Sequence, residues 1–208
     1  MAIDPSRTHI YHITDVSNLS AILSSGYIFS DAQLQQAQDV PTVIGMPHIK
    51  ARRLTELTIP CCDNRYVGEF VPFYYCPRSP MLYTINLGNT GRAPGCQSSI
   101  VHLVSTVSQG MALGRPWAIS DGNAGARHTS FSNQENALDR LDWGTINNRM
   151  WQGKTHAKHS EFLVADYFPW SSIASIGCHS AATAAQVTNL IANQQHKPNV
   201  VVQPNWYY

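Results

Sequence analysis

One carboxylate, Glu161, opens a run of mostly apolar residues within Lys158–Trp170. An acid at the edge of a buried segment must be paired, protonated or used in chemistry, because burying an unpaired charge is costly. One interpretation is a carboxylate in the first turn of a helix, where it complements the helix dipole. The other interpretation is a catalytic glutamate, and this stretch alone leaves both open.

Other side chains that could take part in chemistry precede Glu161 in the chain. His12 lies at the polar end of a predicted strand, where it is either a hydrogen-bonded structural histidine or part of a binding site. Arg52 and Arg53 are adjacent, so on a helix their side chains project about 100° apart and serve different faces. One arginine is then available for an anion while the other faces solvent; a pair that faces solvent together is the alternative.

A dense aromatic stretch, Phe70–Cys76, lies between these residues and Glu161. Such density usually indicates a protein core. Tyr74, Tyr75 and Met81 beside Arg78 would also form a stacking platform for a flat ring. Both interpretations remain open from the sequence.

The motifs of several reaction classes are missing from the sequence. There is no Walker loop (G-x-x-x-x-G-K-[ST]) and no Ser/Cys–His motif, and none of the 9 histidines has the spacing of a helical metal-ligand pair with an acidic partner. We therefore expect no metal. The remaining strategy is positioning plus electrostatics, in which a carboxylate bonds a ribose 2′-hydroxyl and favours an oxocarbenium-like transition state.

Local patterns predict the elements that must position these residues. Thr8–Thr14 alternates and reads as a strand, after which Ser17 is expected to cap a helix that ends at Gly26. A helix is predicted at His48–Leu57, between Pro47 and Pro60. Further strands are predicted at Phe70–Cys76, Ile100–Val104, Ser172–Cys178 and Asn199–Gln203, and further helices from Ser79 or Pro80, at Asn136–Leu141, at Trp143–Trp151 and at Ala181–Ala192.

Three polar stretches lack the periodicity of core elements: Ser30–Pro47, Gly88–Ser98 and Asp121–Ser132. Long loops inside compact domains are usually functional, and the first is predicted to be mobile. The terminal Trp206–Tyr208 is expected to dock. No repeat or linker divides residues 1–208, and strands mix irregularly with helices, so we predict a single α+β domain.

Composition bears on the cellular location of the protein and on its partners. Five cysteines without a Cys-x-x-Cys pair predict free thiols. No apolar run approaches the ~18 residues of a membrane span, and no secretion signal precedes Thr8, so we expect a cytoplasmic protein without a membrane partner. The net charge of +1 does not indicate nucleic acid by itself. A local basic groove requires that cations gather on one face: Lys50, Arg52, Arg53, Arg78, Arg92, Arg115 and Arg127.

Several segments together resemble the DarT family. They are Ile10–Thr14, His48-Ile49 with Arg52-Arg53, Val71–Tyr74, Cys76–Tyr83, Leu141–Trp143, Glu161–Val164 and Trp206–Tyr208. These proteins are toxins of DarT/DarG toxin–antitoxin systems and are related to ADP-ribosyltransferases of the PARP and diphtheria-toxin type. The resemblance spans essentially the whole chain, and Tyr75–Tyr83 is its most specific segment.

The resemblance implies an ADP-ribosyltransferase-like fold with a split central sheet, flanked by helices and long functional loops. It implies that NAD donates ADP-ribose to a ring nitrogen of thymine in single-stranded DNA, which blocks replication, and that a DarG-like macrodomain antitoxin counters the toxin. We expect a monomer. The net charge and the lack of a helix suited to the major groove independently favour a single strand over a duplex.

The resemblance also implies roles for individual residues. Arg53 and Glu161 would be catalytic, and NAD would contact His12, Ile13, Thr14, Ala21, Phe29 and Arg53. Ala21 departs from the glycine expected at its position. Gln33–Arg53 resembles the element that covers NAD, and Asp121–Ser160 resembles the substrate-recognition loop. The residues predicted to bind DNA are His48, Arg52, Tyr75, Arg78, Met81, Arg92, Arg127 and His128.

Two other function classes stay open at this stage. One is an ADP-ribosyltransferase that acts on another base, such as guanine, or on protein. The other is a non-catalytic module that binds NAD or nucleic acid, and the presence of Glu161 argues against it.

Overall fold

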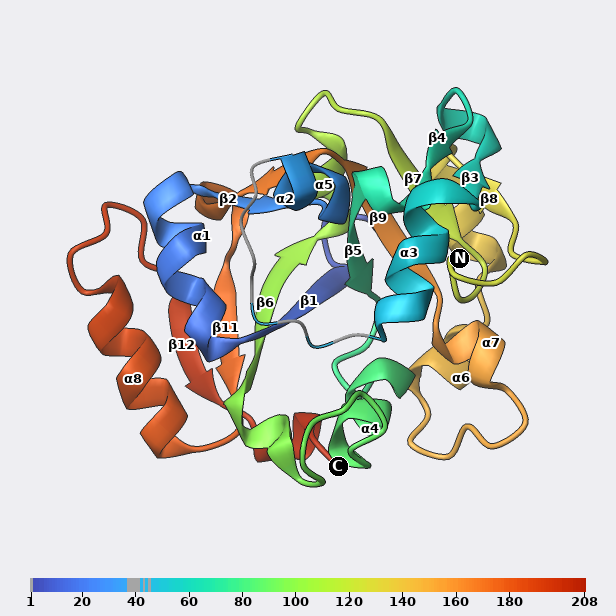
Figure 1. The fold of residues 1–208 in the computed structure, drawn as a ribbon. Helices are drawn as coiled ribbons and strands as arrows, with labels where there is room; N and C mark the ends of the chain where they lie inside the picture. Colours follow the sequence, from blue (N-terminus) through green and yellow to red (C-terminus); the bar gives the residue numbers. More distant parts are fainter. Residues whose placement is uncertain (1, 37–41, 43, 45) are drawn as a thin grey trace.

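The computed structural model of the chain describes residues 2–36, 42, 44 and 46–208. Its centre is an eight-stranded sheet in the order β12-β11-β6-β1-β5-β9-β7-β8 (Figure 1). Neighbouring strands are antiparallel, except that β11 and β12 are parallel. The strands are β1 (His9–Asp15), β5 (Phe70–Tyr74), β6 (Ile100–Thr106), β7 (Trp117–Ser120), β8 (Phe131–Ser132), β9 (Glu161–Ala165), β11 (Ser175–Cys178) and β12 (Asn199–Val202).

The sheet divides in its middle, between β1 and β5. Tyr11 and Tyr74 form the registered pair that joins these two strands. By contrast, β1 pairs with β6 along its whole length, and β5 pairs with β9 along its whole length. The α+β class and the split central sheet are thus confirmed, and the split leaves room for a cleft between β1 and β5.

Helices surround the sheet. They are α1 (Leu19–Ser25), α2 (Asp31–Gln36), α3 (Pro47–Thr55), α4 (Pro80–Asn86), α5 (Val107–Met111), α6 (Trp143–Asn147), α7 (Thr155–Lys158) and α8 (Ala181–Ile191). Figure 1 shows α1 and α8 side by side at one end, where α8 packs against β11 and β12, while α3, α4, α6 and α7 lie toward the other end. Two small sheets pair β2 (Tyr27–Phe29) with β10 (Tyr167–Pro169) and β3 (Thr58–Ile59) with β4 (Arg65–Tyr66).

The segment that begins with Glu161 is a strand, so the interpretation of Glu161 as a residue in the first turn of a helix is wrong. Strand β9 lies between β5 and β7, and all five of its residues are buried. A strand covered on both faces shows an unbroken apolar run without alternation, which periodicity cannot distinguish from a buried helix. Phe162 is packed so tightly that a Cβ on Gly110 would lie 2.4 Å from its ring.

Other predicted boundaries need correction. Ser17 does not cap α1: Asp15 caps a short 3₁₀ turn, η1 (Val16–Asn18), and α1 begins after it. Gly26 ends α1 at φ 78° as predicted, since glycine adopts this left-handed conformation without strain. The predicted helix at Asn136–Leu141 is 3₁₀ (η5, Glu135–Arg140), and the one at Trp143–Trp151 stops at Asn147.

The predicted loop Ser30–Pro47 contains helix α2, which begins after Ser30 because the Ser30 hydroxyl accepts a hydrogen bond from Gln33 N. Residues 37–41, 43 and 45 of this stretch lie outside the described residues, and its predicted mobility stays a prediction. The remaining short 3₁₀ turns are η2 (Pro60–Cys62), η3 (Val67–Glu69), η4 (Cys96–Ser99), η6 (Trp170–Ser172) and η7 (Pro204–Trp206).

The C-terminal residues dock, as predicted. Tyr207 is 2% exposed, and its hydroxyl donates to Ile100 O at 2.8 Å. A Cβ on Gly177 would lie 2.2 Å from the Trp206 ring, so the absence of a side chain in β11 makes room for the C-terminus. All five cysteines are free. Within the described part of the chain, no helix combines the length and apolarity needed to cross a membrane.

Candidate active site

Arg53 and Glu161 form a buried ion pair. Arg53 Nη2 lies 3.2 Å from Glu161 Oε2, and the two side chains are 12% and 1% exposed. Arg53 comes from α3, whereas Glu161 is the first residue of β9. The second carboxylate oxygen, Oε1, accepts a hydrogen bond from Ala124 N at 3.0 Å. Both oxygens of this nearly inaccessible carboxylate are therefore bonded, as a buried charge requires.

The backbone of Glu161 is held as firmly as its side chain. Its N–H donates to Ser120 Oγ at 2.9 Å, and that hydroxyl donates to Gly122 O at 2.7 Å. Ser120 ends strand β7, which flanks β9 in the sheet. The sheet therefore fixes the position of the Glu161 backbone from which the carboxylate side chain projects.

Burial and charge set the protonation of the groups around the pair. Burial alone lowers the pKa of Arg53, but the negative charges near it, that of Glu161 first, and the hydrogen bond to Glu161 together outweigh burial, so that the pKa lies above its ordinary value. Burial, reinforced by the charge of Glu161, raises the pKa of Tyr74, the register partner of Glu161 on β5. Arg53 therefore remains a cation and the Tyr74 phenol remains neutral at physiological pH.

A cleft opens at the split between β1 and β5, and Arg53 lies at its wall. It encloses about 1150 Å³, including solvent at its mouth. The six residues predicted to contact NAD all line it: His12, Ile13, Thr14, Ala21, Phe29 and Arg53. Residues from segments far apart in the chain thus converge on one cavity, although the roles predicted for them remain predictions.

His12 spans the split in the sheet. Its Nδ1 lies 2.9 Å from Pro72 O, and because a carbonyl oxygen can only accept, Nδ1 carries the proton. Burial lowers the pKa of His12, so the ring is neutral at physiological pH and Nε2 presents a lone pair. His12 therefore joins β1 to β5 through its Nδ1 proton and presents Nε2 as a hydrogen-bond acceptor in the wall of the cleft.

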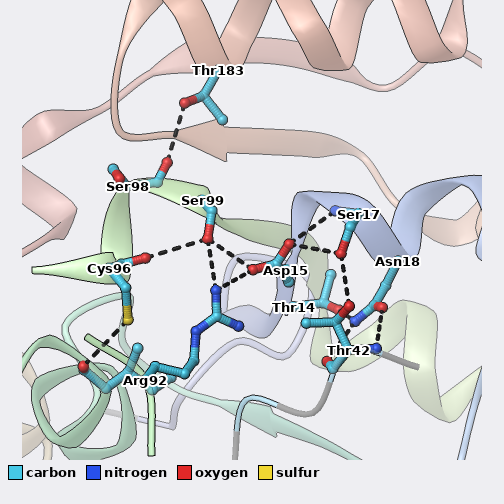
Figure 2. Close-up of polar contacts among 11 residues, drawn as sticks. Thr14, Asp15, Ser17, Asn18, Thr42, Arg92, Cys96, Ser98, Ser99 and Thr183 are labelled. Atoms are coloured by element: carbon cyan, nitrogen blue, oxygen red, sulfur yellow. Dashed lines mark hydrogen bonds and ion pairs between the residues drawn. The ribbon is translucent and has the colours of Figure 1, made fainter. Parts of the chain in front are cut away.

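Sequence reasoning missed several residues of the cleft. Lys50 lies one turn before Arg53 on α3 and also lines the cavity, where its Nζ is 2.7 Å from Asp31 Oδ1. The spacing of three residues between Lys50 and Arg53 was a usable signal, since such residues share a helix face. Asn18 left no signal: its side chain donates to Thr14 Oγ1 and to Thr42 O, and accepts from Thr42 N (Figure 2).

Of the residues predicted to bind DNA, Met81 lines the cleft, whereas His48, Arg52 and Arg127 do not. Met81 lines the cavity beside Tyr74, and His48 is exposed on α3. The side chains of Arg52 and Arg127 are 38% and 78% exposed, and both approach Glu56 Oε2, at 3.4 and 3.3 Å. Arg52 and Arg53 thus point to different surroundings, as their adjacency on a helix predicted.

His128 is exposed on the loop that follows β7. Its ring lies 4.3 Å from that of His156 on α7, and His156 Nε2 lies 3.6 Å from Asp121 Oδ1. The predicted recognition loop Asp121–Ser160 is not structureless, because it contains β8, η5, α6 and α7.

Tyr75 requires a correction. It is 5% exposed and packs edge-on against Trp143 at 5.4 Å, in the main core. The Tyr75 ring packs into the core and does not line the cleft, so it offers no face to a DNA base there. The neighbouring Tyr74 lines the cleft instead, because successive residues of an extended chain point to opposite sides.

Arg78 and Arg92 are each engaged within the protein. Arg78 donates to the Tyr207 carbonyl and lies 4.1 Å over the Tyr208 ring, so it anchors the C-terminus. Arg92 Nη2 donates to Asp15 Oδ2 at 2.5 Å and to Ser99 Oγ at 3.0 Å (Figure 2). The DNA-binding role predicted for these two arginines remains a prediction.

The described residues contain no group of three or more His, Cys, Asp or Glu side chains placed to hold a metal ion. The arrangement that the structure does contain is a cation–carboxylate pair beside a cleft with a neutral histidine and apolar walls. Such a site can orient a ribose and stabilise positive charge on it.

Comparisons with known proteins agree with this geometry. The family model described as "ssDNA thymidine ADP-ribosyltransferase, DarT" matches residues 11–208. A DNA ADP-ribosyl transferase of Thermus aquaticus is 35% identical over 206 residues, which cover 98% of this chain and 90% of the relative. A DNA ADP-ribosyl transferase–DNA ADP-ribosyl glycohydrolase fusion protein of Thermosipho africanus is 32% identical over 81 residues, 39% of this chain and 20% of that protein.

Solved structures match over nearly the whole chain. The structure of Thermus sp. 2.9 DarT in complex with ADP-ribosylated ssDNA has a TM-score of 0.89 and 32% identity, covering 100% of this chain and 99% of that one. Thermus sp. 2.9 DarT in complex with NAD+ has a TM-score of 0.85 and 30% identity, covering 100% of both chains. The chain belongs to the DarT family and is an NAD-dependent DNA ADP-ribosyltransferase.

Proposed function

We propose that the protein transfers ADP-ribose from NAD to the ring nitrogen of thymine in single-stranded DNA. The observation that carries this proposal is the Arg53–Glu161 pair beside the cleft in which the predicted NAD contacts converge. In this reaction the bond between ribose and nicotinamide breaks with its electron pair on nicotinamide. A bond from the thymine nitrogen to the ribose carbon forms, and the ring proton leaves.

The cleft suits NAD in its chemistry. Apolar side chains at Ala21, Ile22 and Phe29 offer cover to flat rings, and Lys50 with Arg53 places two cations on one helix face for the diphosphate. The His12 Nε2 lone pair and the Thr14 hydroxyl can bond polar groups of the ribose or the carboxamide.

Glu161 is proposed to stabilise the transition state. Its carboxylate is buried and bonded at both oxygens, so it presents a fixed negative charge that needs no reorganisation as positive charge develops on the ribose. Its remaining lone pairs can accept a ribose hydroxyl, and the carboxylate can later take up a proton.

Arg53 is proposed to act as a fixed cation. Because its pKa is raised, it is a poor base, and we assign it to holding Glu161 and the NAD phosphates. We infer that the thymine ring proton passes to Glu161 and not to the guanidinium.

The side chains of the cleft, of α3 and of the loop after β7 support a single DNA strand as the substrate. Tyr74 and Met81 line the cavity, while His48, Arg52, Arg127 and His128 lie exposed on α3 and the loop after β7. A few cations and one aromatic wall suit an unpaired base and a short length of backbone.

We further propose that the protein is the toxin of a toxin–antitoxin pair, with a macrodomain that removes the modification as its antitoxin. The partial match to a transferase–glycohydrolase fusion supports this pairing of activities. A cytoplasmic location and a monomeric state remain predictions.

Mass spectrometry of oligonucleotides incubated with the protein and NAD tests the proposal. Four otherwise identical strands that each lack one base are compared, and modification should disappear only when thymine is absent. Loss of modification in the strand that lacks guanine would assign guanine as the acceptor. Modification of the protein alone would assign a protein substrate.

The same oligonucleotide annealed to its complement tests the single-strand preference. The rate should be much lower on the duplex, since unpairing a base costs a few kcal/mol. Equal rates on the two substrates would contradict this preference.

A further inference from the structure

The turn after β7 reaches the catalytic carboxylate through its backbone. Ala124 is 1% exposed, and its N–H is the donor to Glu161 Oε1 at 3.0 Å. Alanine offers no chemistry in a side chain, so this contact depends entirely on how the peptide bond between Asn123 and Ala124 is oriented.

Two hydrogen bonds hold the other side of that peptide bond. The Asn123 carbonyl accepts from Ala126 N at 2.9 Å and from the Thr129 hydroxyl. In a trans peptide the C=O and the following N–H point in opposite directions. Fixing the Asn123 carbonyl toward Ala126 and Thr129 therefore aims the Ala124 N–H toward Glu161.

The Asn123 side chain fixes the same turn. Its Oδ1 accepts from Gly125 N at 2.8 Å, which closes an Asx turn around Ala124. The turn is also wedged from both sides: a Cβ on Gly122 would lie 2.1 Å from His156 Nε2, and a Cβ on Gly125 would lie 3.3 Å from Ile49 on α3. The helix that carries Arg53 thus packs directly against the turn that carries the second partner of Glu161.

We propose that Asn123 and Thr129 are positioning residues for the transfer reaction: they orient the Ala124 N–H so that Glu161 keeps one carboxylate orientation. Without this donor, Oε1 would be buried without a hydrogen-bond partner, and the carboxylate would be free to rotate away from the orientation that its two partners define. The inference rests on the proposed role of Glu161 as an ionised carboxylate, not on the identity of the acceptor base.

Thr129→Val, which removes the hydroxyl at nearly constant shape, is the first test. NAD turnover is measured with a single strand that contains all four bases. We expect kcat to fall on the order of tenfold, with KM for NAD changed by less than about twofold. Thr129→Ser keeps the hydroxyl and should restore kcat.

Asn123→Ala is an independent second test with the same expected result. Asn123→Asp keeps the Oδ acceptor of the Asx turn and should restore kcat. If Asn123→Ala does not fold, as judged by its thermal unfolding, the Thr129 pair alone decides.

A matched control separates this role from general loss of a hydrogen bond. Thr188→Val removes a hydroxyl that donates to Ala184 O on α8. This variant should leave kcat unchanged.

Three results would overturn the inference: an unchanged kcat in Thr129→Val, a fall in kcat that Thr129→Ser does not restore, or a rise in KM for NAD alone. A wild-type protein that consumes NAD without modifying the strand would instead contradict the proposed function, so the two failures are distinguishable.

Discussion

Arg53 Nη2 and Glu161 Oε2 lie 3.2 Å apart although 108 positions separate the two residues in the chain. The Arg53 side chain from α3 reaches the first residue of β9, so that a cation and a carboxylate meet where little water reaches either side chain. Each residue neutralises the other.

Glu161→Gln should abolish most of the transfer while leaving NAD bound. The substitution keeps the shape of the side chain and removes the charge that stabilises the transition state, so kcat should fall on the order of 10²-fold or more. Calorimetric titration with NAD should give an affinity close to that of the wild type. A wild-type rate in Glu161→Gln or Glu161→Ala would assign Glu161 a structural role only.

Arg53→Ala and Arg52→Ala should differ sharply. Arg53 lines the cleft and is 12% exposed in its side chain, whereas Arg52 is 38% exposed and approaches Glu56. Loss of Arg53 leaves Glu161 without its cation and should reduce kcat severely at any salt concentration. Loss of Arg52 should mainly weaken DNA binding, and the defect should grow smaller at high salt, where phosphate contacts matter less. Equal defects at low and high salt would contradict this division.

Arg92→Ala should affect stability and NAD binding and not the salt dependence of DNA binding. Arg92 is bonded to Asp15, whose side chain is 7% exposed and which follows Thr14 at the cleft end of β1. Removing the cation should lower the free energy of unfolding by about 2 kcal/mol and raise KM for NAD. Arg127→Ala is the control: it should leave urea denaturation unchanged and weaken DNA binding at low salt. If DNA binding by Arg92→Ala depended less on salt concentration than binding by the wild type, Arg92 would be a DNA contact.

The protein should lose stability as the pH falls from about 6.5 toward about 4, because His102 is buried as a neutral ring. His102 is 0% exposed, and burial lowers its pKa to about 4. Between these pH values the unfolded chain binds a proton at His102 that the folded protein does not bind. The free energy of unfolding therefore decreases as the pH decreases, and His102 contributes up to about 3 kcal/mol to this decrease. Burial also lowers the pKa values of His12 and His159, which adds to the loss with the same sign.

Urea denaturation between pH 7 and pH 4.5 measures this dependence. His102→Gln should be less stable than the wild type at pH 7 but should show a smaller slope with pH. A wild-type stability that does not change across this range would show that His102 is protonated in the folded protein.

Local sequence patterns were sufficient to predict those helices and strands whose residues show a clear periodicity or a terminating glycine. Strand β1 alternates, Gly26 ends α1, and α8 follows the predicted helix within a residue. Strand β9 has no alternation because both its faces are buried, so its type could not be predicted from periodicity. The candidate catalytic pair and the predicted NAD contacts came from motif residues of the family, and the structure brings all the NAD contacts to one cleft.

Only the tertiary structure decided which of the adjacent tyrosines faces the cleft, and which partner each arginine has within the protein. Tyr74 lines the cleft while Tyr75 is buried against Trp143, and Arg92 is bonded to Asp15, 77 positions away in the chain. A side chain such as arginine has the same chemistry whether it meets a phosphate or a carboxylate of its own protein, so its type cannot predict its partner. The contact of the Ala124 N–H with Glu161 could not be predicted from the sequence at all, because every residue except proline has this donor and only the fold determines where it points.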